Sequence, residues 1–222
     1  YSMMIIMGFL MLTMVSIMLP RAAVAANRID EVLKTEITIK DSHNALTEKT
    51  NNAVVKFDHV DFKYADGEEN VLEDIDFEAK PGQTVAIIGS TGTGKSTLAK
   101  LIPRFFDVTN GKITLDGVDI RDISIETLRS QIGYVPQTGI LFSGDINSNI
   151  SYGAPGIDEA GIKEAAQIAQ ATEFIEDKPD KFESAIAQGG TNVSGGQKQR
   201  LCIARALLKK PKILILDDST SA

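Results

Sequence analysis

The sequence predicts an α/β domain that follows a helix long and apolar enough to cross a membrane. Three observations lead to this fold class. Residues 1–20 contain no charged side chain. The short runs 84–88 and 213–216 are continuously apolar, as expected for strands buried on both faces of a sheet. Helical patterns of apolar residues accompany these runs, at 95–103, 158–170 and 196–209.

Length and composition exclude several classes of protein. The chain has 222 residues, enough for one ordinary domain and part of another, and 43% of them are hydrophobic, which excludes wholesale disorder. With 23 Lys and Arg against 30 Asp and Glu, the net charge is −7, so we expect no nucleic-acid partner. The single cysteine, Cys202, rules out an internal disulfide framework and argues against a Cys-based zinc site. Because the chain starts at Tyr1 and stops at Ala222, just after an apolar run, we interpret it as a piece of a longer protein.

The first segment is predicted to span a membrane. From Met3 to Leu19 the only polar side chains are Thr13 and Ser16. As a helix, residues 1–19 are roughly 28 Å long, close to the ~30 Å of the hydrocarbon core. Two arginines follow this stretch, at positions 21 and 28, which indicates that this end faces the cytoplasm.

Two other interpretations of this segment remain. Residues 23–25, Ala-Val-Ala, resemble the cleavage site of a secretory signal peptide, but no basic region precedes the apolar run. A buried core helix is the second alternative. The apolar spacing of residues 21–34 suits a helix that continues out of the membrane, where Pro20 removes one backbone hydrogen bond and can introduce a kink. We therefore assign 1–34 to the end of a transmembrane domain.

Residues 35–52 are polar and are expected to form a linker, after which 53–222 form the α/β domain. This domain should begin with half-exposed strands. Val60, Phe62 and Tyr64 alternate with polar neighbours, and a second alternating stretch contains an isoleucine and a phenylalanine at 75 and 77. This period of two predicts an antiparallel region of sheet.

The strongest chemical signal is a glycine-rich loop between the apolar run 84–88 and the helical pattern 95–103. Residues 89–96 read Gly-Ser-Thr-Gly-Thr-Gly-Lys-Ser and match G-x-x-x-x-G-K-[ST]. Its glycines allow backbone N–H groups to curl around phosphates, Lys95 can reach the outer phosphates, and Ser96 offers a hydroxyl to Mg²⁺. A glycine-rich turn without a ligand is the alternative. The strand-loop-helix context favours nucleotide binding.

Two further segments fit phosphate chemistry. Asp217 ends the apolar run 213–216, where a nucleotide-bound Mg²⁺ needs a carboxylate ligand or an ordered water. Residues 193–197 read Val-Ser-Gly-Gly-Gln and precede a helix, so Ser194 is a good helix cap and the glycines expose backbone N–H groups. This is a second potential anion site. A capped helix with a flexible entry is the structural alternative.

Taken together, these motifs resemble the ATP-binding cassette (ABC) transporters of the exporter type. Nearly the whole chain takes part in this resemblance. The matching segments are the phosphate loop, 193–197, 213–217, Tyr64, Tyr134-Val135-Pro136-Gln137, Leu141-Phe142-Ser143-Gly144, Asn149-Ile150 and the N-terminal helix with its extension 28–33.

The resemblance implies the fold and the roles of single residues. The fold would be a P-loop NTPase cassette with a parallel core sheet, an antiparallel β subdomain and a helical subdomain at 138–190. Asp218, Gln137 and Lys95 would be catalytic, and the ligands of Mg²⁺ would be Ser96, Gln137 and Asp217. Tyr64 would stack on adenine. The residues implied in ATP binding are Tyr64, Gly89, Ser90, Thr91, Gly92, Thr93, Gly94, Lys95, Ser96, Thr97, Gln137, Ser194, Gly195, Gly196, Gln197 and Asp217.

Three departures from the family pattern stand out. Asp218 occupies the place of a Glu that polarises the attacking water, and its carboxylate is roughly 1.5 Å short of that position, an error that can cost about 10²-fold in rate. Gln188 and Gly189 stand where many exporters have Glu and Arg. The switch histidine has no counterpart, because His43 and His59 lie far upstream of the motifs, and we attribute this to truncation.

The resemblance therefore predicts one ATP-hydrolysing subunit of an exporter. It would pair head-to-tail with a second ABC half-transporter as a heterodimer, contact membrane lipid and move a substrate that the sequence does not identify. We expect it in the cell membrane, multi-pass in the full protein, with the cassette in the cytoplasm. Two alternatives from other classes are a soluble ABC-type ATPase acting on DNA ends and a nucleotide-gated regulatory module with little hydrolysis.

Overall fold

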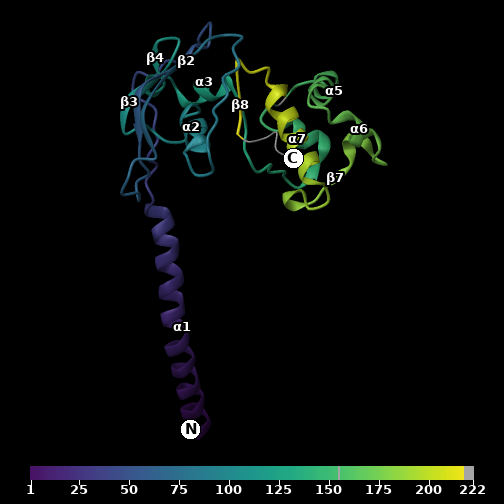
Figure 1. Ribbon diagram of the computed structural model, residues 1–222. Coiled ribbons are helices and arrows are strands. Elements are labelled where there is room, and N and C mark those ends of the chain that lie inside the picture. The colour runs from purple at the N-terminus through teal and green to yellow at the C-terminus, as the bar shows by residue number, and fades with distance from the viewer. Residues whose placement is uncertain (155, 218–222) are drawn as a thin grey trace. The chain divides into compact units, whose positions relative to one another are not determined.

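The computed structural model describes residues 1–154 and 156–217, and the chain divides into two compact units (Figure 1). The first unit is Tyr1–Lys40 and the second is Asp41–Ala222.

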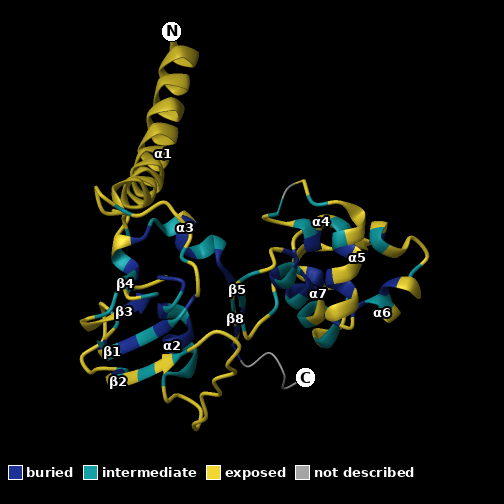
Figure 2. Cartoon of the chain, turned by 90° about the horizontal axis from the view of Figure 1, so that it is seen from above, coloured by how far each residue is buried: buried dark blue, intermediate teal, exposed yellow. Residues whose placement is uncertain are grey.

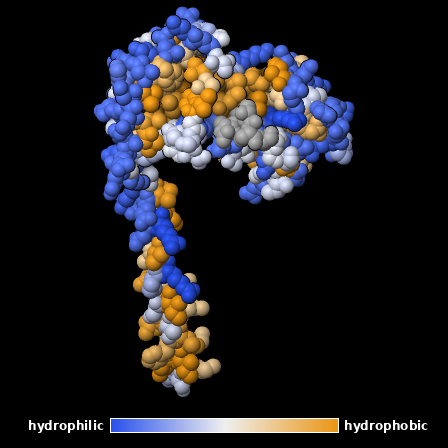
Figure 3. All heavy atoms as spheres, viewed as in Figure 1, coloured by the Kyte–Doolittle hydropathy of each residue, from blue (hydrophilic) through white to orange (hydrophobic). Residues whose placement is uncertain are grey.

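A single long helix makes up most of the first unit. Helix α1 runs from Ser2 to Lys34 without interruption, and Pro20 lies inside it. The two polar side chains of the apolar stretch form hydrogen bonds within the helix. The Thr13 hydroxyl donates to the Phe9 carbonyl, and the Ser16 hydroxyl donates to the Leu12 carbonyl. Its length and composition allow it to cross a membrane, and apolar side chains cover much of its N-terminal half (Figure 3).

The second unit opens with an antiparallel sheet, as the alternating residues predicted. Its strand order is β2-β1-β3-β4, with β1 spanning Val55–Phe62, β2 Leu72–Ala79, β3 Asn110–Leu115 and β4 Val118–Asp119. A register irregularity in β1 falls at His59, whose φ is 47°. This extra residue keeps both Phe57 and Val60 on the buried face of the sheet.

The predicted buried strand at 84–88 is wrong for the part of the chain that the structure describes. These residues pair with no strand there, and Val85 and Ile88 are 47% and 93% exposed. A strand buried on both faces of a sheet needs ladder partners on both sides, and an apolar run does not by itself supply them. Instead, Val85, Ala86 and Ile87 line a cavity together with residues 212–217.

The predicted strand at 213–216 is confirmed. It forms β8, Ile213–Leu216, which pairs in parallel with β5, Ile132–Val135. The partner strand was not predicted, because residues 132–135 include a glycine and a tyrosine and lack a continuous apolar run. The parallel pair places Val135 and Leu216 side by side, so the residues that follow both strands leave the sheet at the same edge.

The three predicted helices are confirmed as α2 (Lys95–Leu101), α5 (Glu159–Ile168) and α7 (Gly195–Leu208). The other elements are α3 (Ile125–Ser130), α4 (Ile146–Ser151), α6 (Thr172–Glu176), the small antiparallel pair β6 (Gly144–Asp145) and β7 (Ala185–Ile186), and the 3₁₀ turns η1 (Ile120–Asp122), η2 (Lys181–Glu183) and η3 (Gln188–Gly190).

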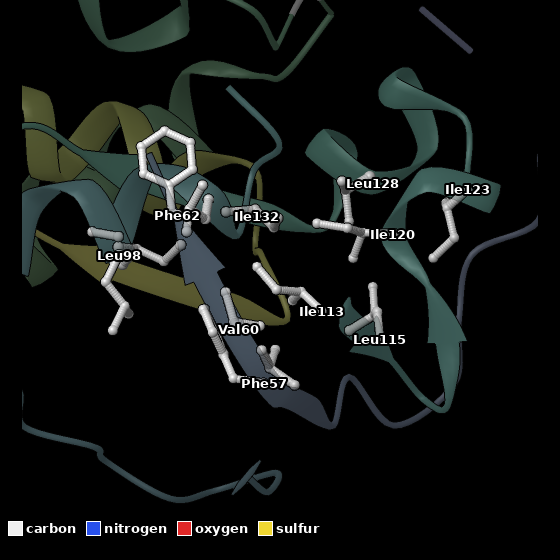
Figure 4. Close-up of a cluster of buried hydrophobic side chains, with 14 of the residues drawn as sticks. Phe57, Val60, Phe62, Leu98, Ile113, Leu115, Ile120, Ile123, Leu128 and Ile132 are labelled. Carbon is white, nitrogen blue, oxygen red and sulfur yellow. The ribbon is translucent and has the colours of Figure 1, made fainter. Parts of the chain in front are cut away.

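Two hydrophobic clusters support the second unit (Figure 2). The first lies against the antiparallel sheet and includes Phe57, Ile113 and Leu98 of α2 (Figure 4). Leu101 of α2 belongs to the same cluster. The second gathers α4 to α6 around Leu201 of α7. The phosphate loop and residues 193–197 are thus anchored on different clusters, because α2 belongs to the first and α7 to the second.

Part of the polar stretch before the sheet is held in place by hydrogen bonds. Asp41 accepts the N–H of Ile125, and Leu46 forms an isolated parallel bridge with Ile123. The Asp116 carboxylate accepts the backbone N–H groups of residues 52–54 at 2.8 to 3.0 Å. These contacts fix residues 41–54 against the rest of the second unit, and the domain boundaries expected from the sequence stay a prediction.

Candidate functional site

The glycine-rich loop adopts a shape that depends on its glycines. Gly92 and Gly94 have φ of 88° and 85°, in the left-handed region that favours glycine. A Cβ on Gly94 would lie 2.8 Å from Leu72 of β2, and one on Gly89 would lie 2.7 Å from the Thr93 hydroxyl. The loop therefore passes close to the antiparallel sheet and turns tightly before α2 begins at Lys95.

Lys95 spans the loop that precedes it. Its Nζ donates to the carbonyl of Gly89 at 2.9 Å and to that of Ser90 at 2.7 Å. An ammonium group has three protons, so a phosphate oxygen can accept the remaining one, or replace one of these carbonyls. The side chain is thus held over the concave side of the loop, where the family motif requires a cation.

Ser96 and Asp217 meet although 121 residues separate them. The Ser96 hydroxyl donates to Asp217 Oδ1 at 2.6 Å, and Asp217 is only 7% exposed. The sequence predicted both as Mg²⁺ ligands from two unrelated segments. Their contact joins the start of α2 to the end of β8, and it supplies the hard oxygen donors that Mg²⁺ prefers.

Tyr134 is a site residue that the sequence analysis did not single out. Its hydroxyl donates to Asp217 Oδ2 at 3.2 Å, so the two carboxylate oxygens have different donors. Burial, the charge of Asp217 and this hydrogen bond raise the pKa of Tyr134 to about 12. The tyrosine consequently remains a donor at neutral pH and orients the carboxylate. The signal that could have found it is its place on the strand that pairs in parallel with β8.

One cavity of about 740 Å³ brings most of the predicted phosphate-site residues together. Its volume is in the range of ordinary small-ligand sites. Gln137 reaches it from the end of β5, which supports the expectation that this residue belongs to the same site. The predicted residues that line the cavity are Thr91, Gly92, Gly94, Lys95, Ser96, Thr97, Gln137 and Asp217.

Tyr64 lies beside this site but is not among the residues that line the cavity. Its hydroxyl shares a hydrogen bond of 3.0 Å with Thr97 Oγ1, on the first turn of α2. Its ring meets Phe62 and Phe106 edge-on, with centroids 4.8 and 5.2 Å away. The contact with Thr97 ties Tyr64 to the phosphate loop, and stacking on adenine stays a prediction.

The segment 193–197 forms a separate site. Ser194 caps α7 by accepting the Gln197 N–H at 3.2 Å, and Gln197 Oε1 accepts the Ser194 N–H at 3.0 Å. A Cβ on Gly195 or Gly196 would meet nothing within 4 Å, so packing among the described residues does not explain either glycine. Without a Cβ at these two positions, a ligand or another chain can approach the backbone N–H groups closely.

Two further residues named in the sequence analysis need a short account. Asp218, the predicted catalytic acid, lies outside the described residues. Gly189, which stands where many exporters have Arg, has φ of 66° in η3, a conformation that glycine adopts more easily than arginine.

Comparison with known proteins agrees with this geometry. The sequence profile of the ABC transporter family matches residues 72–221. The ABC transporter ATP-binding protein YfiB of Bacillus subtilis is 45% identical over 202 residues, which cover 91% of this chain and 35% of YfiB. The putative multidrug export ATP-binding/permease protein YgaD of the same organism is 43% identical over 204 residues, which cover 92% of this chain and 35% of YgaD.

A solved structure is similar along almost the whole chain. A bacterial Atm1-family ABC exporter with ATP bound superimposes with a TM-score of 0.84 and 37% sequence identity, covering 96% of this chain and 37% of that one. The chain therefore spans about a third of the length of the relatives it matches.

Proposed function

The chain belongs to the ABC transporter family, and on this premise we propose that it is the ATP-binding and ATP-hydrolysing part of an exporter subunit. The observation that carries the proposal is the contact of Ser96 with Asp217 beside the Lys95 ammonium, in one cavity. Each of these side chains has a distinct task in binding a nucleoside triphosphate with its metal ion.

The donor set fits Mg²⁺. A serine hydroxyl, a carboxylate and the side chain of Gln137 offer hard oxygen ligands, and the carboxylate is oriented by Tyr134. Mg²⁺ would neutralise charge on the β- and γ-phosphates of ATP. The chain's own residues bind the phosphates through the loop N–H groups and Lys95, and Gln137 would place the attacking water.

We assign the separate site at the start of α7 to a second nucleotide. Gly195 and Gly196 leave the backbone N–H groups of the helix start open to approach, and they do not line the cavity of the phosphate loop. As in other ABC transporters, this signature would contact the γ-phosphate of ATP that a partner cassette holds. Two cassettes would then close head-to-tail over two ATP molecules.

The finer proposal is a heterodimer with unequal ATP sites. Asp218 is one methylene shorter than the Glu that activates water in hydrolytic family members, so the site on Lys95 and Asp217 would hydrolyse slowly. A partner that supplies Glu would form a fast site with this chain's Ser194 and its two glycines. The slow site would hold ATP and stabilise the closed dimer.

Helix α1 supports a membrane location. Its apolar part is long enough to span the bilayer, and Arg21 and Arg28 follow on the side where we place the cytoplasm. We propose that residues 1–34 end the transmembrane domain and that 53–222 form the cassette on the cytoplasmic side. We propose that the transmembrane helices, and not the cassette, select the cargo.

Substitution on each side of the dimer tests this proposal. Ser194→Ala in the full-length complex should lower steady-state ATPase activity at least tenfold, because it damages the fast site in trans. Asp218→Ala should lower it less than twofold, because that site contributes little turnover. The measurement is phosphate release by the purified complex in lipid vesicles.

Two results would contradict the proposal of a heterodimer with unequal ATP sites. Equal losses in the two variants would show that both sites hydrolyse ATP. Brisk ATPase activity of a homodimer made from this chain alone would show that Asp218 is no obstacle to turnover.

A further inference from the structure

Arg205, in the last turn of α7, holds two segments that precede that helix in the sequence. Its Nε donates to the Asn149 carbonyl at 2.8 Å and its Nη2 to Asn149 Oδ1 at 2.9 Å. Its Nη1 donates to the Ile140 carbonyl at 2.9 Å. The planar guanidinium fork thus bonds to a loop and a helix at the same time.

Aromatic rings complete the surroundings of this guanidinium. Its Cζ lies 5.4 Å from the centre of the Phe142 ring and 5.6 Å from that of Tyr152. Burial lowers the pKa of Arg205 below its usual value. Within the described residues Arg205 forms no ion pair. The free-energy cost of burying its charge is offset by the backbone carbonyls and the aromatic rings around it, and these partners fix the position of the guanidinium.

The loop that Arg205 holds is the one that begins at Gln137. Ile140 is three residues after Gln137, and between them Gly139 passes so close to α7 that a Cβ there would lie 3.2 Å from Cys202 Sγ. Asn149, on α4, completes the attachment of this loop, since its side chain accepts the Phe142 N–H at 2.9 Å and donates to the Phe142 carbonyl at 2.8 Å.

We propose that Arg205 is a positioning residue that couples Gln137 to the signature at the start of α7. Arg205 does not line the cavity of the phosphate loop and is not bonded to Ser194. It acts by fixing the loop that begins at Gln137 to α7, the helix that Ser194 caps. Movement of Gln137 toward a γ-phosphate would then carry the whole of α7 with it. This inference rests on the proposed function, because it concerns the step between ATP binding and hydrolysis.

The first test separates binding from turnover in the full-length complex. Arg205→Gln removes the fork and frees α7 from the Gln137 loop, so Ser194 is no longer carried onto the fast site that it completes in trans. We therefore expect kcat to fall about tenfold or more, while the affinity of this chain's own site for ATP stays within about twofold. Arg205→Lys should be intermediate, because an ammonium group cannot bond to Ile140 and Asn149 with the same geometry. The measurements are ATPase kinetics and equilibrium binding of a fluorescent ATP analogue.

Arg200 provides a matched control on the same helix. Its Nη1 also donates to a backbone carbonyl, that of Gln170, at 3.1 Å, but this carbonyl does not belong to the Gln137 loop. Arg200→Gln should therefore leave kcat within about twofold of the wild type. A loss equal to that of Arg205→Gln would overturn the proposal.

A second tether tests whether attachment of the loop is what Arg205 supplies. In a disulfide, one Cβ lies about 3.0 Å from the other sulfur, close to the 3.2 Å found between position 139 and Cys202 Sγ. Gly139→Cys in the Arg205→Gln background should form this bond under copper phenanthroline, which oxidises the two thiols. The bond should restore most of kcat, and dithiothreitol should abolish the recovery.

The outcomes decide between the possibilities. A bond that forms without restoring kcat, an unchanged kcat in Arg205→Gln, or a parallel loss of ATP affinity would each overturn the positioning role. If Arg205→Gln does not accumulate in the membrane, the same rescue is measured on Arg205→Lys. Failure of the proposed function is distinguishable, since the wild-type complex would then hydrolyse no ATP.

Discussion

At the scale of single residues, hydrogen-bond partners fix the orientation of Asp217 and the protonation of Tyr134 in the phosphate site. Asp217 is held by Ser96 on one oxygen and by Tyr134 on the other, and it is nearly buried. A carboxylate with a separate donor on each oxygen keeps its orientation. The raised pKa of the Tyr134 phenol keeps it protonated and able to donate.

A second titratable contact lies away from the nucleotide site, on the antiparallel sheet. His59 Nδ1 is 2.6 Å from Asp74 Oδ1, and His59 Nε2 is 3.5 Å from Asp76 Oδ2. The hydrogen bond to Asp74 is the largest cause that raises the pKa of His59, followed by the charges of Asp74 and Asp76. Because the ion pair forms only when His59 is protonated, it links His59 of β1 to Asp74 of β2 most strongly when the histidine carries its proton. Both residues lie at the register irregularity of these two strands.

We predict that Asp74→Asn lowers the pKa of His59 toward its usual value of 6.5. Because the folded-state pKa is the raised one, the stabilisation that this pair contributes is fully present below pH 6.5 and is lost as the pH rises through the folded-state pKa. A histidine-detected NMR titration of wild type and variant measures both values. An identical titration midpoint in the two proteins would show that Asp74 does not set the pKa.

At the scale of elements, the phosphate loop offers a matched pair of glycines. Gly92 and Gly94 both have positive φ, but only at Gly94 would a Cβ meet neighbours, namely Leu72 at 2.8 Å and the Val71 carbonyl at 3.1 Å. Gly92→Ala therefore measures backbone strain alone, at about 1–2 kcal/mol. Gly94→Ala adds a steric clash with β2 to the same strain.

We predict that Gly94→Ala lowers the melting temperature and the affinity for ATP more than Gly92→Ala does. The added cost arises because Leu72 is buried and cannot move away freely. Differential scanning calorimetry and ATP titration of both variants measure the difference. Equal effects would mean that the loop does not lie against β2 as described.

The comparison of elements also shows what the sequence can predict. Motifs that combine chemistry with local spacing were reliable: the loop before Lys95 and the aspartate after β8 lie in one cavity. The apolar run 84–88 failed as a buried strand, because hydrophobicity alone does not supply a ladder partner, and its side chains are exposed. The strand at 132–135 was missed because its glycine and tyrosine conceal its parallel pairing, and with it the role of Tyr134.

Contacts between distant segments escaped prediction for a similar reason. Nothing in the sequence around Arg205 indicates its partners, which lie 56 and 65 residues earlier in the chain. No local pattern encodes such a separation. The pairing of Asp116 with the backbone of residues 52–54 has the same character.

At the scale of the whole molecule, two units with different chemistry follow one another in the chain. The first, Tyr1–Lys40, is dominated by a helix with no buried residue, and the second contains both hydrophobic clusters and all the described phosphate motifs. This division is what an ATP-driven membrane transporter requires of one subunit. The central claim of the account is that the second unit binds Mg-ATP through Lys95, Ser96 and Asp217.

Equilibrium binding of Mg-ATP to the full-length protein carrying Lys95→Ala tests this claim most directly. Lys95 bridges the loop carbonyls of Gly89 and Ser90 and supplies its cation, so its loss should weaken binding to this chain's own site about 100-fold. Lys100→Ala is the matched control, because Lys100 lies on the same helix but does not line the cavity. The account predicts unchanged affinity in Lys100→Ala and a large loss in Lys95→Ala. Wild-type affinity in Lys95→Ala would contradict it.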